Sequence, residues 1–154
     1  MIGVAEIKQI IPHRYPILLL DRVIEVRPGE SLVAHKAITC AEPCYQNTDD
    51  YAYPVSLLVE SWAQAAVLLA CWETPNPDVL AGKVELAAGI KNVDLLEPVF
   101  PGEVLEHHVQ ILRNVADAAI VAGSSFVGGR KVLEVGSFSV ALRGVEVLMR
   151  PGGD

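Results

Sequence analysis

One long apolar run constrains the fold of this chain more than any other feature. From Val55 to Trp72, 14 of 18 residues are apolar, with Pro54 before the run and Pro75 after it. Proline suits the first turn of a helix, where its missing N–H would have no partner anyway, and it commonly follows a helix end. A helix that is apolar nearly all the way round must be buried. We therefore predict a central helix at residues 54–73, around which the rest of the chain is organised.

The polar residues of this run are placed rather than scattered. Ser56, Glu60 and Gln64 recur every four residues, so they form one polar stripe along the helix. A carboxylate inside an apolar helix is costly unless it is paired, protonated or functional. Glu60 is therefore the first candidate for a functional residue. The alternative that the residues leave open is a glutamate at a wet helix edge or an interface, with a satisfied hydrogen bond.

Several function classes are disfavoured by composition. The run is nearly long enough to span a bilayer, but Glu60 lies inside it and the flanking chain has the pattern of soluble strands. The net charge of −7 argues against a nucleic-acid partner. The first residues, 1–4, show no charged segment before an apolar run, so no signal peptide is expected. Cys40, Cys44 and Cys71 are odd in number and contain no C-x-x-C pattern, so we expect reduced thiols in a cytoplasmic protein, without a disulfide or a metal site.

The remaining chain reads as strands within one domain, residues 1–154. A short amphipathic helix is predicted at 4–11, and residues 149–154 are predicted to be a frayed tail. Strand patterns occupy six ranges: 17–26, 31–38, 83–93, 103–114, 118–127 and 131–143. This order predicts an α+β fold in which a six-stranded antiparallel sheet wraps around the central helix. The open edges of such a sheet predict side-by-side pairing in a dimer.

Four segments carry a resemblance to a known family. They are Ile10–Val23 (IIPHRYPILLLDRV), Glu42–Gln46 (EPCYQ), Glu60–Ala66 (ESWAQAA), and Gly89-Ile90 followed by Pro98–Glu103 (PVFPGE). In this order they resemble the FabZ-type 3-hydroxyacyl-[acyl-carrier-protein] dehydratases of the hotdog superfamily. The resemblance implies a hotdog fold, a dimer with substrate tunnels at the subunit interface, and no metal. It also implies acyl chains delivered on the phosphopantetheine of an acidic acyl carrier protein, with no other cofactor.

The same resemblance makes Glu60 the catalytic glutamate and exposes a departure from the family. There the glutamate works across the dimer with a histidine of a Gly-His-Phe-Pro-Gly segment, whereas this chain has seven residues and no histidine between Gln46 and Pro54. Elimination of water needs both a base for the α-proton and an acid for the leaving hydroxyl. Half of that apparatus is therefore missing from this loop. The loop offers only weak substitutes, which are Asp49, Asp50 and Tyr51.

The other histidines are not expected to replace it. His13 belongs to the Pro-His-Arg-Tyr-Pro segment, where a structural role at the start of a strand is predicted. His35, His107 and His108 lie on predicted strands. The family comparison thus assigns a catalytic histidine to none of the four.

Further positions follow from the resemblance. Val55 stands where the family has a glycine, and its backbone amide would still hold a thioester carbonyl at the helix N-terminus. Tyr53 and Ser56 are predicted to line the tunnel, with Gln64 supporting the catalytic carboxylate. Glu97 stands where the family commonly has basic residues, so it would repel an acidic carrier protein. Docking would then depend on a local patch of Arg130, Lys131, Arg143 and Arg150, or on a partner chain; the alternative is that these four are ordinary surface charges.

Three hypotheses remain open on the sequence. In the first, the chain is a subunit of a heteromeric dehydratase and a homologous partner supplies the histidine; in this it resembles the histidine-lacking dehydratase-like proteins of polyene-forming carrier-protein systems. In the second, it is a self-sufficient hotdog enzyme of another class, such as a thioesterase that uses Glu60 to activate water. In the third, it is a non-catalytic binding or scaffold subunit.

Overall fold

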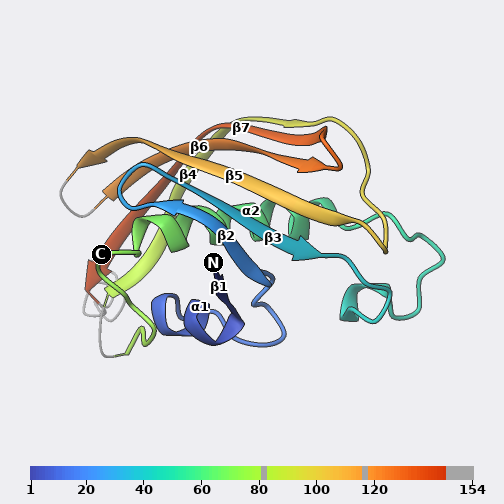
Figure 1. Cartoon of the computed structure of the whole chain (residues 1–154), viewed down its shortest axis with the longest axis horizontal. Coiled ribbons are helices and arrows are strands. Elements are labelled where there is room, and N and C mark those ends of the chain that lie inside the picture. The colour runs from blue at the N-terminus through green and yellow to red at the C-terminus, as the bar shows by residue number, and fades with distance from the viewer. Residues whose placement is uncertain (81–82, 116–117, 145–154) are drawn as a thin grey trace, which may run out of the picture.

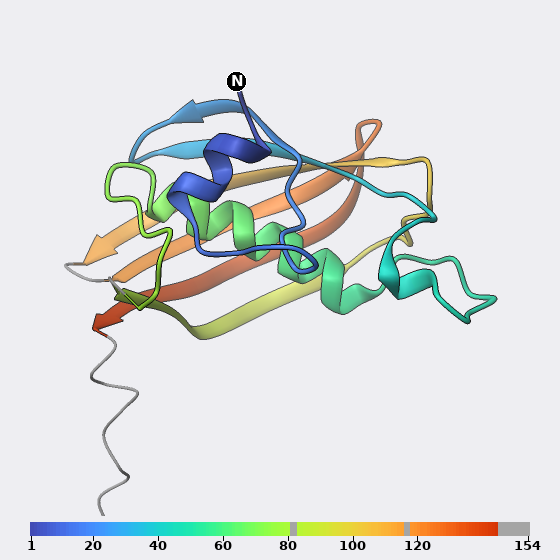
Figure 2. The same ribbon diagram turned by 90° about the horizontal axis from the view of Figure 1, so that it is seen from below.

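A seven-stranded antiparallel sheet wraps around one long helix in the computed structural model (Figures 1 and 2). The structure describes residues 1–80, 83–115 and 118–144, so Arg150 and the predicted tail at 149–154 lie outside the described residues. The elements in chain order are β1 (Ile2–Gly3), α1 (Val4–Ile10), β2 (Arg22–Arg27), β3 (Ser31–Ala37), the 3-10 turn η1 (Pro43–Tyr45), α2 (Val55–Ala70), β4 (Lys83–Leu95), β5 (Val104–Val115), β6 (Ala118–Val127) and β7 (Arg130–Gly144). The strand order is β1-β2-β3-β5-β6-β7-β4.

The central helix α2 is buried in the core over most of its length, whereas its first turn is exposed at Val55 and Ser56. Pro54 caps it at its first turn, and the helix ends at Ala70, three residues short of the predicted end. Trp62 is fully buried, donates its Nε1–H to the carbonyl of His108 on β5 (3.3 Å) and packs edge-on against Phe138 of β7. No helix in the described part of the chain is long and apolar enough to cross a membrane.

The predicted fold class is confirmed, with one strand more than expected. The additional strand is β1, whose two residues pair with Arg22 and Val23 of β2. The predicted hairpin between the first two strands is also present, because β2 pairs antiparallel with β3.

The prediction of a strand from residue 17 is wrong for its first half, since β2 begins only at Arg22. Leu19 and Leu20 are buried, but their segment is irregular. Its backbone is satisfied by other means: the N–H of Leu18 donates to the carbonyl of Arg14 (2.9 Å), and the N–H of Leu19 donates to the side chain of Gln64 (2.9 Å). A side chain of α2 therefore replaces the neighbouring strand that a ladder would need.

Strand β4 forms one edge of the sheet and contains a bulge. Ala87 pairs with Val140 of β7, whereas Gly89 pairs with Ser139, so Ala88 is the extra residue. Within the described chain β4 pairs only with β7, which leaves its other edge without a partner strand.

Candidate active site

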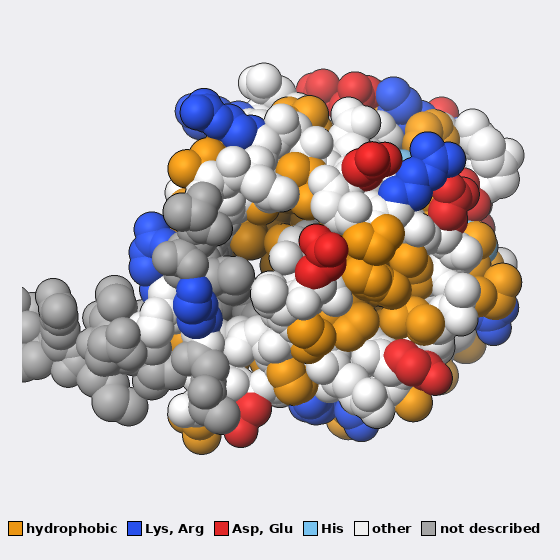
Figure 3. All heavy atoms as spheres, turned by 60° about the vertical axis from the view of Figure 1, so that its left-hand side comes forward, with side chains coloured by type: hydrophobic (Ala, Val, Ile, Leu, Met, Phe, Trp, Pro, Cys, Tyr) orange, Lys and Arg blue, Asp and Glu red, His pale blue; other side chains and the backbone are white. Residues whose placement is uncertain are grey.

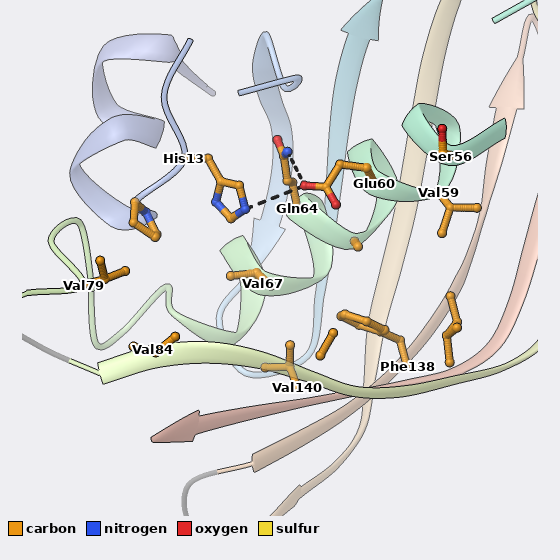
Figure 4. Close-up of a pocket in the computed structure, with 14 residues that line it drawn as sticks. His13, Ser56, Val59, Glu60, Gln64, Val67, Val79, Val84, Phe138 and Val140 are labelled. Atoms are coloured by element: carbon orange, nitrogen blue, oxygen red, sulfur yellow. Dashed lines mark hydrogen bonds and ion pairs between the residues drawn. The ribbon is translucent and has the colours of Figure 1, made fainter. Parts of the chain in front are cut away.

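A cavity of about 420 Å³ lies between α2 and the strands β4 and β7 (Figure 4). Its walls are mostly apolar, with Val59, Ala63 and Val67 from α2 facing Phe138 and Val140 from β7. The polar lining side chains are Ser56, Glu60, Gln64 and His13. The predicted stripe on the helix thus lines one cavity, and a histidine from elsewhere in the chain joins it.

Glu60 is held in place by Gln64, one turn along the helix. Gln64 is buried, and its Nε2 donates to Oε1 of Glu60 (2.7 Å) and to the carbonyl of Ile17 (2.7 Å). The amide orientation is fixed because its Oε1 accepts the N–H of Leu19 (2.9 Å), so its NH₂ group must face Glu60. The Glu60 carboxylate therefore has a defined position, with Oε1 anchored by Gln64 and Oε2 turned away from Gln64 and His13 (Figure 4).

His13 approaches the same carboxylate from the segment that follows α1. Its Nε2 lies 3.8 Å from Oε1 of Glu60, and the two side chains are 22% and 37% exposed. In the sequence these residues are 47 positions apart, so neither spacing nor periodicity could bring them together. The structural role predicted for His13 did not include a place in the cavity.

Tyr53 and Val55 lie at the N-terminal end of α2, outside this cavity. They line a smaller hollow of about 230 Å³ together with Leu95 and Leu96. Tyr53 is buried, and its backbone N–H donates to the carbonyl of Val99 (2.7 Å). Burial raises the pKa of its phenol far above the usual range, so the group stays protonated. Val55 is the first residue of α2, where a backbone N–H has no partner within the helix.

The family model of the FabA-like domain matches residues 11–136. The chain belongs to this family. It is 36% identical over 138 residues to the 3-hydroxyacyl-[acyl-carrier-protein] dehydratase FabZ of Campylobacter fetus, covering 87% of this chain and 93% of the relative. It is 33% identical over 138 residues to the FabZ of a Nitratiruptor species, with the same shares covered. The resemblance to FabZ-type dehydratases is thereby confirmed.

Solved structures share the hotdog fold. The dehydratase heterocomplex ApeI:P from Xenorhabdus doucetiae contains a chain with a TM-score of 0.78 and 16% identity, covering 93% of this chain and 94% of that one. A hypothetical thioesterase with coenzyme A from Streptococcus pneumoniae has a TM-score of 0.60 and 12% identity, covering 80% of this chain and 85% of that one. At these identities the likeness concerns the fold alone.

The loop that lacks the family's histidine projects beyond the N-terminal end of α2 (Figures 1 and 2). Asp50 is engaged locally, since it accepts the N–H of Ala52 (3.0 Å), and Tyr51 stacks on Tyr45 at 6.0 Å between ring centroids. Among the residues described, the cavity lining includes neither these two side chains nor Asp49. Within its own subunit, this loop does not bring a substitute for the histidine to Glu60.

The family segment Glu42–Gln46 has a structural role at the start of this loop. Glu42 accepts the buried ammonium of Lys36 (3.0 Å) and the N–H of Thr39 (3.1 Å). The Lys36 ammonium also lies 5.7 Å from the ring centroid of Tyr53. This buried ion pair fastens the loop to β3.

The residues predicted to dock a carrier protein are largely paired with carboxylates. Arg130 donates to Glu97 (2.8 Å) and Glu103 (2.9 Å), and Lys131 donates to Glu134 (2.8 Å). Figure 3 brings forward the side of the molecule away from the turn between β6 and β7, and on that side acidic and basic side chains lie interspersed. Docking at these residues and at Arg143 stays a prediction. In the described ranges no three His, Cys, Asp or Glu side chains gather as metal ligands would.

Proposed function

We propose that this chain is a dehydratase, a lyase that eliminates water from 3-hydroxyacyl thioesters on an acyl carrier protein and yields the trans-2-enoyl product. Membership of the family supports the dehydratase role. The observation that carries the proposal is the position of Glu60, a partly buried carboxylate anchored by Gln64 on the wall of a largely apolar cavity. We further propose that the reaction serves fatty-acid or polyketide and polyene biosynthesis in the cytoplasm.

In this mechanism the apolar wall holds the acyl chain and Glu60 acts on the 3-hydroxyl group. The protonated carboxyl gives its proton to the leaving hydroxyl, which departs as water. A base removes the α-proton, the electron pair of the broken C2–H bond forms the double bond between C2 and C3, and the C3–O bond breaks with its electrons leaving on the water. The backbone N–H groups at the start of α2, beginning with Val55, would hold the thioester carbonyl as negative charge develops on it. Tyr53 and Ser56 would border the path of the pantetheine arm.

The loop before α2 does not place a base beside Glu60. We propose that a homologous subunit supplies it as a histidine, in a heterodimer assembled along the open edge of β4. Two observations support an assembly of this kind. The loop projects from the body of the subunit, and a chain of similar fold forms part of the ApeI:P dehydratase heterocomplex. A homodimer is the competing assembly.

Two other functions would use the same cavity. A hotdog thioesterase would use Glu60 to activate water and release a free acid, and a scaffold subunit would keep Glu60 without chemistry. The dehydration assay separates them, because hydrolysis removes the acyl group from the carrier protein whereas dehydration lowers its mass by one water.

The test combines this chain with a histidine-bearing FabZ-type subunit whose own catalytic glutamate has been replaced by glutamine. Turnover then depends on Glu60, and mass spectrometry of the acyl carrier protein measures it. We expect the mixture to be active, each protein alone to be weak or inactive, and Glu60→Gln to lower turnover about 10²-fold or more while the complex still assembles. Glu73→Gln, which changes an exposed glutamate beyond α2, is the matched control. Full activity of the Glu60→Gln mixture would contradict the proposal.

A further inference from the structure

The two oxygens of Glu60 have different surroundings. Oε1 receives the amide of Gln64 at 2.7 Å and faces Nε2 of His13 at 3.8 Å. Within the part of the chain that the structure describes, Oε2 makes no hydrogen bond or ion pair, and Figure 4 shows it turned away from His13. Gln64 makes a hydrogen bond to Oε1, whereas the His13 imidazole, at 3.8 Å, lies beyond hydrogen-bond distance and forms an ion pair with Oε1 when it is protonated. Both groups therefore lie on the Oε1 side of the carboxylate, which leaves Oε2 available for a substrate.

The segment that carries His13 is irregular, yet it is fastened on both sides of that residue. On one side, the guanidinium of Arg14 donates to four carbonyls, those of Lys8, Ile11, His13 and Pro77, at 2.7–3.3 Å. On the other side, Gln64 bonds to the backbone of Ile17 and of Leu19. Arg14 thus ties the segment to α1 and to the loop after α2, and Gln64 ties it to α2 itself.

Gln64 therefore connects the two partners of Glu60. The same amide that anchors the carboxylate also bonds to the segment that presents the imidazole, so Gln64 and Arg14 together fix how far His13 lies from Glu60. Surface charges that meet by chance lack such a support. The His35–Glu106 pair is a comparison for the His13–Glu60 pair: His35 also lies near a glutamate, 3.2 Å from Glu106, but on the outer face of the sheet and away from the cavity.

We propose that His13 is a positioning residue for Glu60: its imidazole holds Oε1 in place, so that Oε2 is the oxygen that meets the substrate hydroxyl. The inference rests on the proposed function for its kinetic consequence. His13 does not replace the histidine of the partner subunit, since the imidazole lies on the anchored side of the carboxylate. The two imidazoles would have separate tasks, one on the substrate and one on the carboxylate.

The kinetic test uses the mixture described above. Replacing His13 by alanine removes the contact with Oε1, and we expect kcat to fall about 5-fold with little change in KM, because substrate binding does not use this contact. Added imidazole should restore part of kcat by entering the space left at this partly exposed position, whereas it would not restore a variant that had merely lost structure. His13→Gln, which keeps a neutral donor, should lie between the wild type and His13→Ala. His35→Gln is the matched control, and its kcat should equal that of the wild type.

A second measurement does not depend on activity. Nitrogen-15 NMR of the imidazole rings, recorded on the assembled protein, should show the His13 signals shifting in Glu60→Gln while those of His35 and His108 stay unchanged. Unchanged His13 signals would overturn the proposal, as would a wild-type kcat in His13→Ala or a loss confined to KM. If the wild-type mixture is inactive, the proposed function fails, and the NMR result alone decides whether His13 positions Glu60.

Discussion

Replacing Gln64 by methionine tests whether one buried amide holds the site together. Methionine has a similar length, so the change removes polar atoms and leaves little empty space. The N–H of Leu19, a residue only 6% exposed, then loses its acceptor, and a stranded donor of this kind costs about 1–3 kcal/mol. Loss of the bond to Glu60 adds about 0–1 kcal/mol, since water reaches a carboxylate that is 37% exposed. Together these losses should lower the free energy of unfolding by about 1–4 kcal/mol.

Urea denaturation measures this change, at one fixed protein concentration because assembly contributes to stability. The matched control is Gln9→Met on the exposed face of α1, which should change the free energy of unfolding by less than about 0.5 kcal/mol. A loss below about 1 kcal/mol in Gln64→Met would refute the reasoning. It would mean that Leu19 finds another acceptor and that the segment carrying His13 does not depend on this amide.

Two further predictions concern the sheet. His107 is fully buried, and desolvation lowers its pKa to about 3. Between pH 6.5 and 3 the unfolded chain therefore binds more protons at this residue than the folded chain does. The free energy of unfolding falls as the pH falls through this range, by up to about 1.4 kcal/mol per pH unit. Urea midpoints should be measured at pH 5–6.5, above the pH range in which Glu106 titrates, because hydrogen bonds to His108 and His35 lower the pKa of Glu106. In His107→Asn the midpoint should depend less steeply on pH than in the wild type. An unchanged slope would count against a buried neutral His107 ring. A Cβ at Gly123 would lie 1.9 Å from the carbonyl oxygen of His108, so Gly123→Ala should lower the thermal midpoint by several degrees, whereas Gly89→Ala, with open space around its Cβ, should not; equal midpoints would contradict the close approach.

The fold could be predicted because its main signals are local. Helix α2 follows from a long apolar run, and β6 follows from a mostly apolar run between two turn signals. The strand predicted from residue 17 failed because an apolar run does not distinguish a strand from a buried irregular segment. What decides at Leu19 is an acceptor on Gln64, 45 positions away.

From the sequence, only the part of the site that lies on helix α2 could be predicted. The stripe of Ser56, Glu60 and Gln64 depends on helical spacing alone, and all three residues do line one cavity. The place of His13 depends on how Arg14 and Gln64 fold a segment without regular structure, and no periodic pattern records such contacts. Tyr53 lines a separate hollow at the N-terminal end of α2, and its predicted place in a tunnel at the subunit interface stays a prediction.

The bulge in β4 determines which side chains close the cavity opposite Glu60. Ala87 and Ile90 both line it, although residues three apart on a regular strand point to opposite faces. The extra residue, Ala88, brings Ile90 back to the same face of the sheet as Ala87, so that Ala87 lies opposite Val140 and Ile90 opposite Phe138. The dimensions of the cavity are therefore encoded in the residue count of an edge strand as well as in side-chain size. Deleting Ala88 would turn Ile90 outward and widen the cavity without altering the chemical identity of any lining residue.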